Sequence, residues 1–356
     1  MTTALDHYRL LGRTGLRVSP LSLGAMTFGT DFGWGTAEPE AHRIFDAYVD
    51  RGGNFIDTAN IYTFGTSETM VGRFSQEKRQ RCVIATKYSN GMDPGDPNSA
   101  GNHRKNMVRS LEDSLRRLNT DYVDVLYLHA WDGRTGADEV LRAFDDLITA
   151  GKVLYPALSD IPAWQASRMQ AIADLRALAP IAAVQVEYSL IERSVDWELI
   201  PMARECGMGI IPWSPLGGGI LSGKYSRSDA EATGGALNIE AASRRALNLA
   251  QGKVTQRALD IADVVAGIAK DLEVPAAAVA LAWVMQRPGV TSTIIGARTF
   301  EQFEQNLIAS EVALTAEELT LLDSASAIPA PWPHSMLSLE YMRHQLAGGV
   351  SVEDRI

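Results

Sequence analysis

Short apolar runs recur along the chain, each about as long as one buried strand. Eight of them stand out: Leu21–Leu23, Phe55–Ile56, Val83–Ala85, Val123–Leu126, Val153–Leu158, Ala183–Val186, Met208–Pro212 and Ser292–Ile295. They lack the strict alternation with polar residues that marks a strand with one solvated face. The pattern therefore predicts parallel strands that are covered on both faces.

Helical spacing fills the segments between these runs. One predicted helix carries apolar residues at i, i+3 and i+4 spacing: Met107, Val108, Leu111, Leu115 and Leu118. Another begins near Thr135, which precedes Asp138 in the spacing of a capping box, and ends at Gly151. Its predicted inward face consists of Val140, Phe144 and Leu147.

This alternation of eight strands with helices predicts a single (β/α)8 TIM barrel domain over residues 1–356. A doubly wound open sheet is the alternative, but no Gly-x-Gly-x-x-Gly motif follows the first strands. Three segments exceed a minimal barrel: an expected N-terminal hairpin at 8–20 that seals the barrel bottom, a Gly/Ser/Ala-rich loop at 214–252, and a C-terminal tail at 326–356. Loops as long as the second are usually functional or mobile.

The composition limits which classes of binding partner are expected. The chain has 356 residues and a formal net charge of −10, which argues against nucleic acid or an anionic membrane, because both attract clustered Lys and Arg. The N-terminus lacks an apolar signal segment, and no window resembles a membrane span. Cys82 and Cys206 are too few for a disulfide framework or a Cys-rich metal site. We expect a cytoplasmic protein without a metal; a homo-oligomer is compatible with the sequence but not indicated.

The candidate chemistry lies where apolar runs end, because barrel active sites form at the carboxyl ends of the strands. Asp57, Lys87 and His129 end three successive runs, and Tyr62 follows shortly after Asp57. Each alone also suits a turn, a cap or a rim hydrogen bond. Together they suit one site: Asp57 is placed to pair with a buried Lys87, and a cation beside Tyr62 would lower its pKa from about 10.

Ordered motifs around these residues resemble the aldo-keto reductase family over nearly the whole chain. They are Leu23-Gly24-Ala25-Met26-Thr27-Phe28-Gly29, Asp57-Thr58-Ala59-Asn60-Ile61-Tyr62, Gly65-Thr66-Ser67-Glu68, Thr86-Lys87 and Asp124-Val125-Leu126-Tyr127-Leu128-His129. The resemblance implies a catalytic tetrad of Asp57, Tyr62, Lys87 and His129, which serves hydride transfer from a reduced nicotinamide to a carbonyl. Tyr62 would be the general acid and His129 would orient the carbonyl, while Lys87, paired with Asp57, tunes Tyr62.

The resemblance also implies a cofactor site. Its expected residues are Gly24, Ala25, Met26, Asp57, Ser159, Asp160, Gln185, Trp213, Ser214, Pro215, Leu216, Gly217, Gly218, Lys224, Gly296, Arg298, Gln302, Gln305 and Asn306. Among these, Ser159, Asp160 and Gln185 would contact the carboxamide and Trp213 would stack on the nicotinamide. The loop that continues to Lys224 would cover the pyrophosphate. Arg298 suits a 2′-phosphate, so NADPH/NADP+ is expected rather than NADH.

The chain departs from the family pattern at a few cofactor positions. Asp160 replaces the more common Asn, Gln305 replaces Glu, and Gly296-Ala297 replaces the Lys-Ser of many mammalian members. The expected substrate is a small-molecule carbonyl, an aldehyde or a ketone. Four aromatic residues are candidates for its pocket: Trp34, Tyr88, Trp131 and Trp332. Packing of loops on the barrel rim explains Trp34 and Trp332 equally well.

Two other functions stay open. A Schiff-base aldolase also uses a lysine at a barrel strand end, but it needs Lys87 without a carboxylate partner or with a depressed pKa. The family also includes the beta subunits of voltage-gated potassium channels, cofactor-binding regulatory proteins with slow turnover. Those subunits lack a histidine at the position of His129, so the sequence favours an enzyme.

Overall fold

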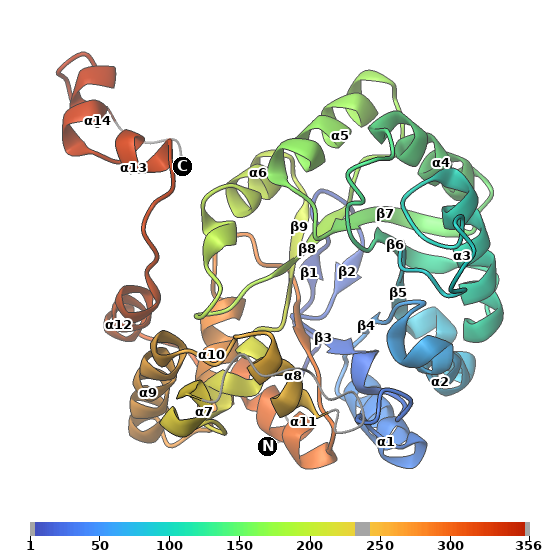
Figure 1. Ribbon diagram of the computed structural model, residues 1–356, viewed down its shortest axis with the longest axis horizontal. Coiled ribbons are helices and arrows are strands. Elements are labelled where there is room, and N and C mark those ends of the chain that lie inside the picture. The colour runs from blue at the N-terminus through green and yellow to red at the C-terminus, as the bar shows by residue number, and fades with distance from the viewer. Residues whose placement is uncertain (1–3, 232–242, 353–356) are drawn as a thin grey trace.

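Eight short, buried, parallel strands form the centre of the molecule. The computed structural model describes residues 4–231 and 243–352. The strands are β3 (Leu21–Gly24), β4 (Phe55–Asp57), β5 (Val83–Tyr88), β6 (Val123–Leu128), β7 (Val153–Ser159), β8 (Ala183–Glu187), β9 (Gly209–Trp213) and β10 (Thr293–Ile295). They pair in the order β10-β3-β4-β5-β6-β7-β8-β9. This chain-order pairing, with helices around it in Figure 1, confirms the predicted barrel and excludes the doubly wound sheet.

A backbone contact joins the two ends of this sheet. The amide of Thr291 donates to the carbonyl of Ile210 at 2.8 Å, and Ile210 forms a parallel bridge with Val290. These contacts link β9 to the segment that leads into β10. The sheet therefore closes on itself, with the carboxyl ends of all eight strands at one mouth.

Helices follow the strands, and most of them cover the outer faces of the strands. They are α1 (Glu38–Asp50), α2 (Thr66–Ser75), α3 (Arg104–Leu118), α4 (Ala137–Thr149), α5 (Ala163–Leu175), α6 (Leu199–Glu205), α7 (Arg227–Glu231), α8 (Arg244–Ala250), α9 (Gln256–Asp271), α10 (Ala276–Met285), α11 (Phe300–Leu307), α12 (Ala316–Ser326), α13 (His334–Leu337) and α14 (Glu340–Leu346). Among the described helices, none is long and apolar enough to cross a membrane.

The two helices predicted from apolar spacing are present, but one of their caps differs from the prediction. Gly151, with φ +72°, follows α4 as the predicted stop. The predicted capping box of Thr135 and Asp138 is wrong: Gly136 is the N-cap and no side chain caps the helix. The hydroxyl of Thr135 instead donates to Asp132 Oδ2 at 2.7 Å. A closer acceptor in the preceding loop has therefore taken this hydroxyl.

The N-terminal hairpin seals the bottom of the barrel, as predicted. Its strands are β1 (Arg9–Leu10) and β2 (Arg17–Val18), which pair antiparallel. Leu11 and Val18 are fully buried in the cluster that fills the barrel interior. Gly12 has φ +56°, and a Cβ there would lie 2.5 Å from the carbonyl oxygen of Ala182. Only glycine therefore allows the hairpin turn to approach the strand ends this closely.

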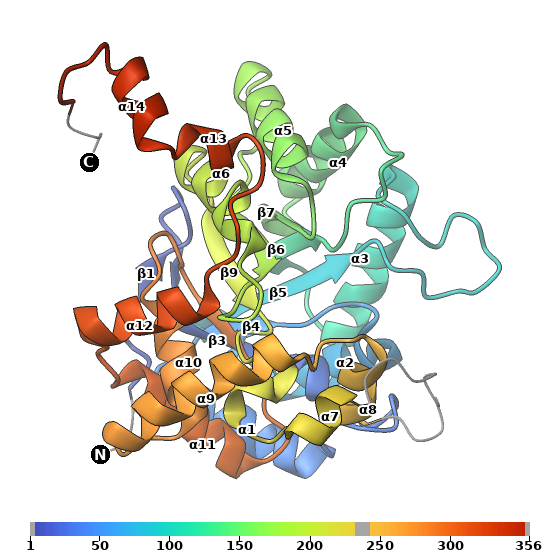
Figure 2. The same ribbon diagram turned by 60° about the vertical axis from the view of Figure 1, so that its left-hand side comes forward.

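The two other extra segments differ in how they pack. The predicted loop at 214–252 contains the 3-10 helix η5 (Gly217–Ser222) together with α7 and α8, and its residues 232–242 lie outside the described part. After α12 the tail leaves the barrel, and Figures 1 and 2 both show α13 and α14 projecting from it. His334 Nε2 meets Glu198 Oε1 at 2.7 Å near the start of this projection. The last tail residues, 353–356, also lie outside the described part.

Candidate active site

Three neighbouring strands bring the four candidate catalytic side chains together. Asp57 ends β4, Lys87 lies in β5 and His129 directly follows β6, while Tyr62 begins the 3-10 turn η2 (Tyr62–Gly65) after β4. The Nζ atom of Lys87 lies 2.6 Å from Asp57 Oδ2 and 3.2 Å from the Tyr62 hydroxyl. The rings of Tyr62 and His129 meet edge to face at 5.8 Å. The predicted tetrad is thus one connected cluster.

The Lys87–Asp57 ion pair is buried and fully hydrogen-bonded. Lys87 has no exposed surface, and its ammonium also donates to the carbonyl oxygen of Thr58 at 2.9 Å. The second carboxylate oxygen, Asp57 Oδ1, accepts from Gln185 Nε2 at 2.8 Å. A buried pair repays the cost of desolvation only when its remaining donors and acceptors are satisfied in this way. The pair therefore holds the ammonium at a fixed position beneath Tyr62.

Burial and nearby charges set the protonation states of Lys87 and Tyr62. Burial lowers the pKa of Lys87, but Asp57 and Tyr62 together raise it more, and the net pKa is raised. Burial raises the pKa of Tyr62, and the Lys87 ammonium lowers it by less, so the net pKa is raised as well. The expected influence of the cation on Tyr62 is present but smaller than that of burial. At neutral pH the cluster holds an ammonium beside a neutral phenol.

His129 is neutral at the same site. Burial, with a contribution from the nearby positive charge of Lys87, lowers the pKa of His129 from 6.5 to about 3. Its Nδ1 atom lies 3.0 Å from the side-chain amide nitrogen of Asn90. A neutral imidazole carries one N–H donor and one acceptor nitrogen. His129 therefore brings directional hydrogen bonding, and no positive charge, to the mouth of the barrel.

A strained turn fixes Tyr62. Thr63 and Phe64 adopt left-handed conformations, with φ of +46° and +53°. The hydroxyl of Thr63 donates to the carbonyl of Phe28 at 2.7 Å and accepts from the amide of Ser67 at 3.0 Å. Left-handed backbone at non-glycine residues costs free energy, and surrounding contacts must maintain it. Here those contacts come from the Gly65-Thr66-Ser67 segment and from the loop after β3.

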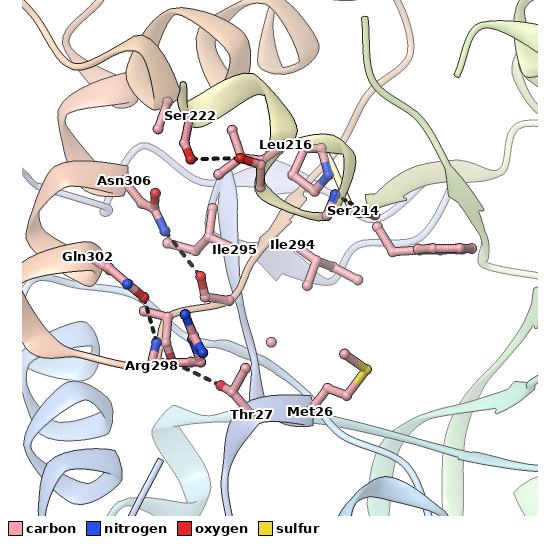
Figure 3. A pocket seen from close by; sticks show the side chains of 18 of the residues that line it. Met26, Thr27, Ser214, Leu216, Ser222, Ile294, Ile295, Arg298, Gln302 and Asn306 are labelled. Carbon is pink, nitrogen blue, oxygen red and sulfur yellow. Dashed lines mark hydrogen bonds between the residues drawn. The ribbon is translucent and has the colours of Figure 1, made fainter. Parts of the chain in front are cut away.

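A cavity of about 630 Å³ opens beside this cluster. Its walls include Tyr62 and His129 and most of the expected cofactor residues: Gly24, Met26, Asp57, Ser159, Asp160, Gln185, Trp213, Ser214, Pro215, Leu216, Gly218, Lys224, Gly296, Arg298, Gln302, Gln305 and Asn306. Figure 3 shows Arg298, Gln302 and Asn306 on one wall, Ser214 and Leu216 on another, and Met26 with Thr27 on a third. Ala25 and Gly217 are buried behind the lining.

Comparisons with known proteins agree with this geometry. The family model of the aldo/keto reductases matches residues 20–327. The chain belongs to the aldo/keto reductase family. Its relatives include the uncharacterized oxidoreductase YrpG of Bacillus subtilis, which is 39% identical over 327 residues, 89% of this chain and 95% of the relative.

Two fungal relatives carry names that state an activity. Norsolorinic acid reductase B of Dothistroma septosporum is 35% identical over 351 residues, which cover 95% of this chain and 86% of the relative. Aryl-alcohol dehydrogenase [NADP(+)] of Phanerodontia chrysosporium is 34% identical over 351 residues, 92% of this chain and 88% of the relative. This aldo/keto reductase therefore has oxidoreductases among its relatives along nearly its full length.

The cavity of this aldo/keto reductase fits a nicotinamide dinucleotide. Ser159 Oγ is buried and has no hydrogen-bond partner within the described residues, so it is available to an amide such as the carboxamide. Gly24 lines the cavity without a side chain, and a Cβ there would lie 2.7 Å from a methyl group of Ile294 on the neighbouring strand. Lys224 and Arg298 are exposed in the lining, and neither forms an ion pair within the part described. These unpartnered groups suit an anionic ligand with an amide at one end.

Asp160, a departure from the usual family pattern, contacts the predicted stacking residue. Its Oδ1 accepts from the indole Nε1 of Trp213 at 3.0 Å. The backbone of Asp160 has φ +41°, and its amide bonds to the carbonyl of Gln185 at 3.3 Å. A carbonyl oxygen of asparagine would accept from Trp213 in the same way. The replacement therefore keeps this contact and adds a negative charge to the wall.

Other lining residues were not predicted. Arg245 and Tyr225 line the cavity from the segment after β9, and Arg245 lies over the Tyr225 ring at 5.5 Å. The first turn of α10 contributes Ala276 and Ala277. The sequence carries one signal for Arg245, which is the presence of an arginine in a Gly/Ala-rich stretch. The apolar helix start carries no such signal.

Only one of the four aromatic pocket candidates lines the cavity. Trp34 does so, from the loop after β3. Tyr88 is instead fully buried behind the barrel wall, where its hydroxyl donates to the carbonyl of Asn102 at 3.1 Å. Successive strand residues face opposite sides, so an inward Lys87 requires an outward Tyr88. Trp131 packs against the outer core, and Trp332 is 75% exposed in the projecting tail.

Proposed function

We propose that this aldo/keto reductase reduces an aldehyde or ketone to an alcohol, reversibly, with NADPH as the reductant. One observation carries the proposal: the buried Asp57–Lys87 pair reaches the hydroxyl of Tyr62 at 3.2 Å, beside a neutral His129 at the cavity wall. Besides a hydride, carbonyl reduction requires an acid that protonates the developing alkoxide and a cation that stabilises the conjugate base of that acid. It also benefits from a neutral hydrogen-bond donor that orients the carbonyl.

The four side chains divide the work. When bound, the reduced nicotinamide supplies a hydride to the carbonyl carbon. Tyr62 keeps its proton at neutral pH because burial raises its pKa, and it gives that proton to the carbonyl oxygen as negative charge develops there. The Lys87 ammonium stabilises the phenolate left behind, and Asp57 holds Lys87 in place. In the reverse direction the phenolate takes the hydroxyl proton of the alcohol.

NADPH is proposed over NADH because of the charged end of the cavity. Arg298 is exposed there, and its backbone amide donates to Gln302 Oε1 at 3.0 Å. A guanidinium recognises a phosphate through paired N–H donors, which a 2′-hydroxyl does not match. Ser159, Asp160 and Gln185 would hold the carboxamide, Lys224 the pyrophosphate, and Gln302, Gln305 and Asn306 the adenosine. The NADP(+) in the name of one relative supports this choice.

Aromatic carbonyls are the proposed substrate class. Met26, Trp34 and Trp213 line the cavity together with Tyr62 and His129, and flat aromatic and thioether surfaces pack well on an aryl ring. Several relatives are named for aryl alcohols or for norsolorinic acid.

The cytoplasmic location stays a prediction, supported by two cysteines, Cys82 and Cys206, that do not pair.

The Schiff-base alternative is disfavoured by the state of the lysine. An amine attacks a carbonyl only when it is deprotonated, and the Asp57 carboxylate holds the Lys87 proton. Lys87 is also fully buried and does not line the cavity. Borohydride added with a carbonyl compound should leave Lys87 unmodified. A reduced adduct on this lysine would contradict the reductase proposal.

Nicotinamide absorbance tests the proposal directly. NADPH and NADH are compared in parallel against benzaldehydes, aryl ketones, aliphatic aldehydes and sugars. We expect absorbance to fall fastest with NADPH and an aryl aldehyde. Tight NADPH binding without turnover across the whole panel would instead support a regulatory, cofactor-binding protein.

A further inference from the structure

Asn90 lies behind His129, in the loop that follows β5. Its side-chain nitrogen Nδ2 is 3.0 Å from His129 Nδ1. An amide nitrogen only donates hydrogen bonds, so Nδ1 is the acceptor. His129 is neutral and carries a single ring proton, which then resides on Nε2. Asn90 itself does not line the cavity, whereas His129 does.

Asn90 is held from two directions. Its backbone carbonyl accepts a hydrogen bond from the side-chain amide of Asn60 at 3.1 Å. Asn60 is fully buried, and in the sequence it lies between Asp57 and Tyr62. The preceding Ser89 has φ +111°, and its hydroxyl oxygen accepts from the backbone amide of His129 at 3.2 Å. Left-handed backbone outside glycine persists only where its surroundings maintain it. The turn at Ser89 therefore directs the chain so that Asn90 meets the histidine.

We propose that Asn90 is a positioning residue that fixes the Nε2–H tautomer of His129. With Nδ1 occupied, Nε2 is the ring nitrogen left for the cavity, and as a donor it can bond to a carbonyl oxygen near Tyr62. The opposite tautomer would present a lone pair to that oxygen and repel it. The effect on catalysis rests on the proposed function, but the tautomer itself does not.

The first test needs no substrate. Protein labelled with 15N-histidine is studied by NMR, and the His129 signals are assigned by their loss in His129→Gln. We expect an unprotonated Nδ1 and a protonated Nε2 in the wild type. In Asn90→Asp, a carboxylate that only accepts should move the proton to Nδ1 and leave Nε2 without one. A wild-type ring protonated on Nδ1, or an unchanged tautomer in Asn90→Asp, would overturn the proposal.

The second test separates positioning from folding. Asn90→Asp should lower kcat for an aryl aldehyde by about 100-fold or more, the cost of losing one well-placed donor. The Kd for NADPH should stay within about twofold. Asn98→Asp, which adds the same charge to an exposed site in the same loop, is the matched control and should leave kcat unchanged. If Asn90→Asp keeps full kcat while its tautomer changes, the catalytic part is overturned.

Should Asn90→Asp fail to fold, Asn90→Ser keeps the same tests open, because a hydroxyl still donates but is too short to reach Nδ1 without a shift. We expect a mixture of tautomers and an intermediate loss of kcat in this variant. A single Nε2–H tautomer there would show that Asn90 is not needed to select it. Absence of turnover in the wild type would defeat the proposed function alone, since the tautomer is read without a substrate.

Discussion

Two sides of the barrel mouth are built differently. On the catalytic side, which comprises Asp57, Tyr62, Lys87 and His129, polar groups find partners within the chain, as both oxygens of Asp57 do. On the cofactor side, which comprises Ser159, Lys224 and Arg298, the serine hydroxyl is unpartnered and the two cations are exposed without ion pairs among the described residues. The difference suggests that the catalytic groups are already in their working positions without a ligand. The groups on the cofactor side keep their hydrogen-bonding capacity free for the cofactor.

The two sides should therefore respond differently to substitution. Removing one member of a buried, satisfied network leaves the others without partners, so stability and catalysis fall together. Removing an exposed group that contacts only a ligand should weaken the affinity for that ligand and leave the stability of the fold nearly unchanged.

The largest effect is expected for Lys87→Met. The variant leaves the buried carboxylate of Asp57 uncompensated, which should reduce the free energy of unfolding by about 3–5 kcal/mol and abolish turnover. Urea denaturation measures the loss. The double variant with Asp57→Asn should recover much of the stability but none of the activity. Equal stability of Lys87→Met and the wild type would mean that water reaches the Lys87–Asp57 ion pair.

Tyr62→Phe should remove the acid while leaving the fold intact. General acid catalysis contributes about 10²–10⁴-fold, so kcat/KM should fall by that factor. The Kd for NADPH, from fluorescence titration, should change by less than about twofold, since the hydroxyl lies on the catalytic side. A parallel loss of NADPH affinity would erase the distinction between the two sides.

Acid should destabilise the protein partly through His129. The pKa of His129 is about 3 in the folded protein and 6.5 ordinarily. Between these two pH values the imidazole binds a proton in the unfolded chain but not in the folded protein. Stability from this group is complete above pH 6.5 and declines toward pH 3. Between pH 7 and 4.5 the wild type should lose about 2–3 kcal/mol more than His129→Gln. Identical pH profiles in chemical denaturation would refute a neutral imidazole with a lowered pKa.

The smallest effect belongs to the cofactor side. Arg298→Ala should raise the Kd for NADPH by about 10-fold or somewhat more, the worth of hydrogen bonds to a charged group. The Kd for NADH and the thermal unfolding midpoint should stay unchanged. Arg298→Lys should recover part of the NADPH affinity. An equal weakening of NADH would point to a contact with the adenine or the pyrophosphate instead of the 2′-phosphate.

The placement of a residue is predictable from the sequence where its determinant is local. Asp57, Lys87 and His129 each end an apolar run, and parallel strands bring such ends together without further information. Placement is not predictable where neighbours compete, since Thr135 donates its hydroxyl to Asp132. Tyr88 was misplaced for another reason: strand alternation, which the sequence does show, makes it face outward when Lys87 faces inward. Arg245 and Asn90 were missed because their partners are set by the paths of loops, which spacing along the chain does not reveal.

The closure of the barrel has a consequence for how the protein is made. β3 lies near the start of the chain and pairs with β10, one of the last elements. During synthesis the edge of β3 must wait, unpaired, until nearly the whole polypeptide has left the ribosome, and non-local parallel pairing is slow. Aggregation during expression should therefore be most sensitive to changes that delay or weaken the arrival of β10, far from any residue that performs the reaction.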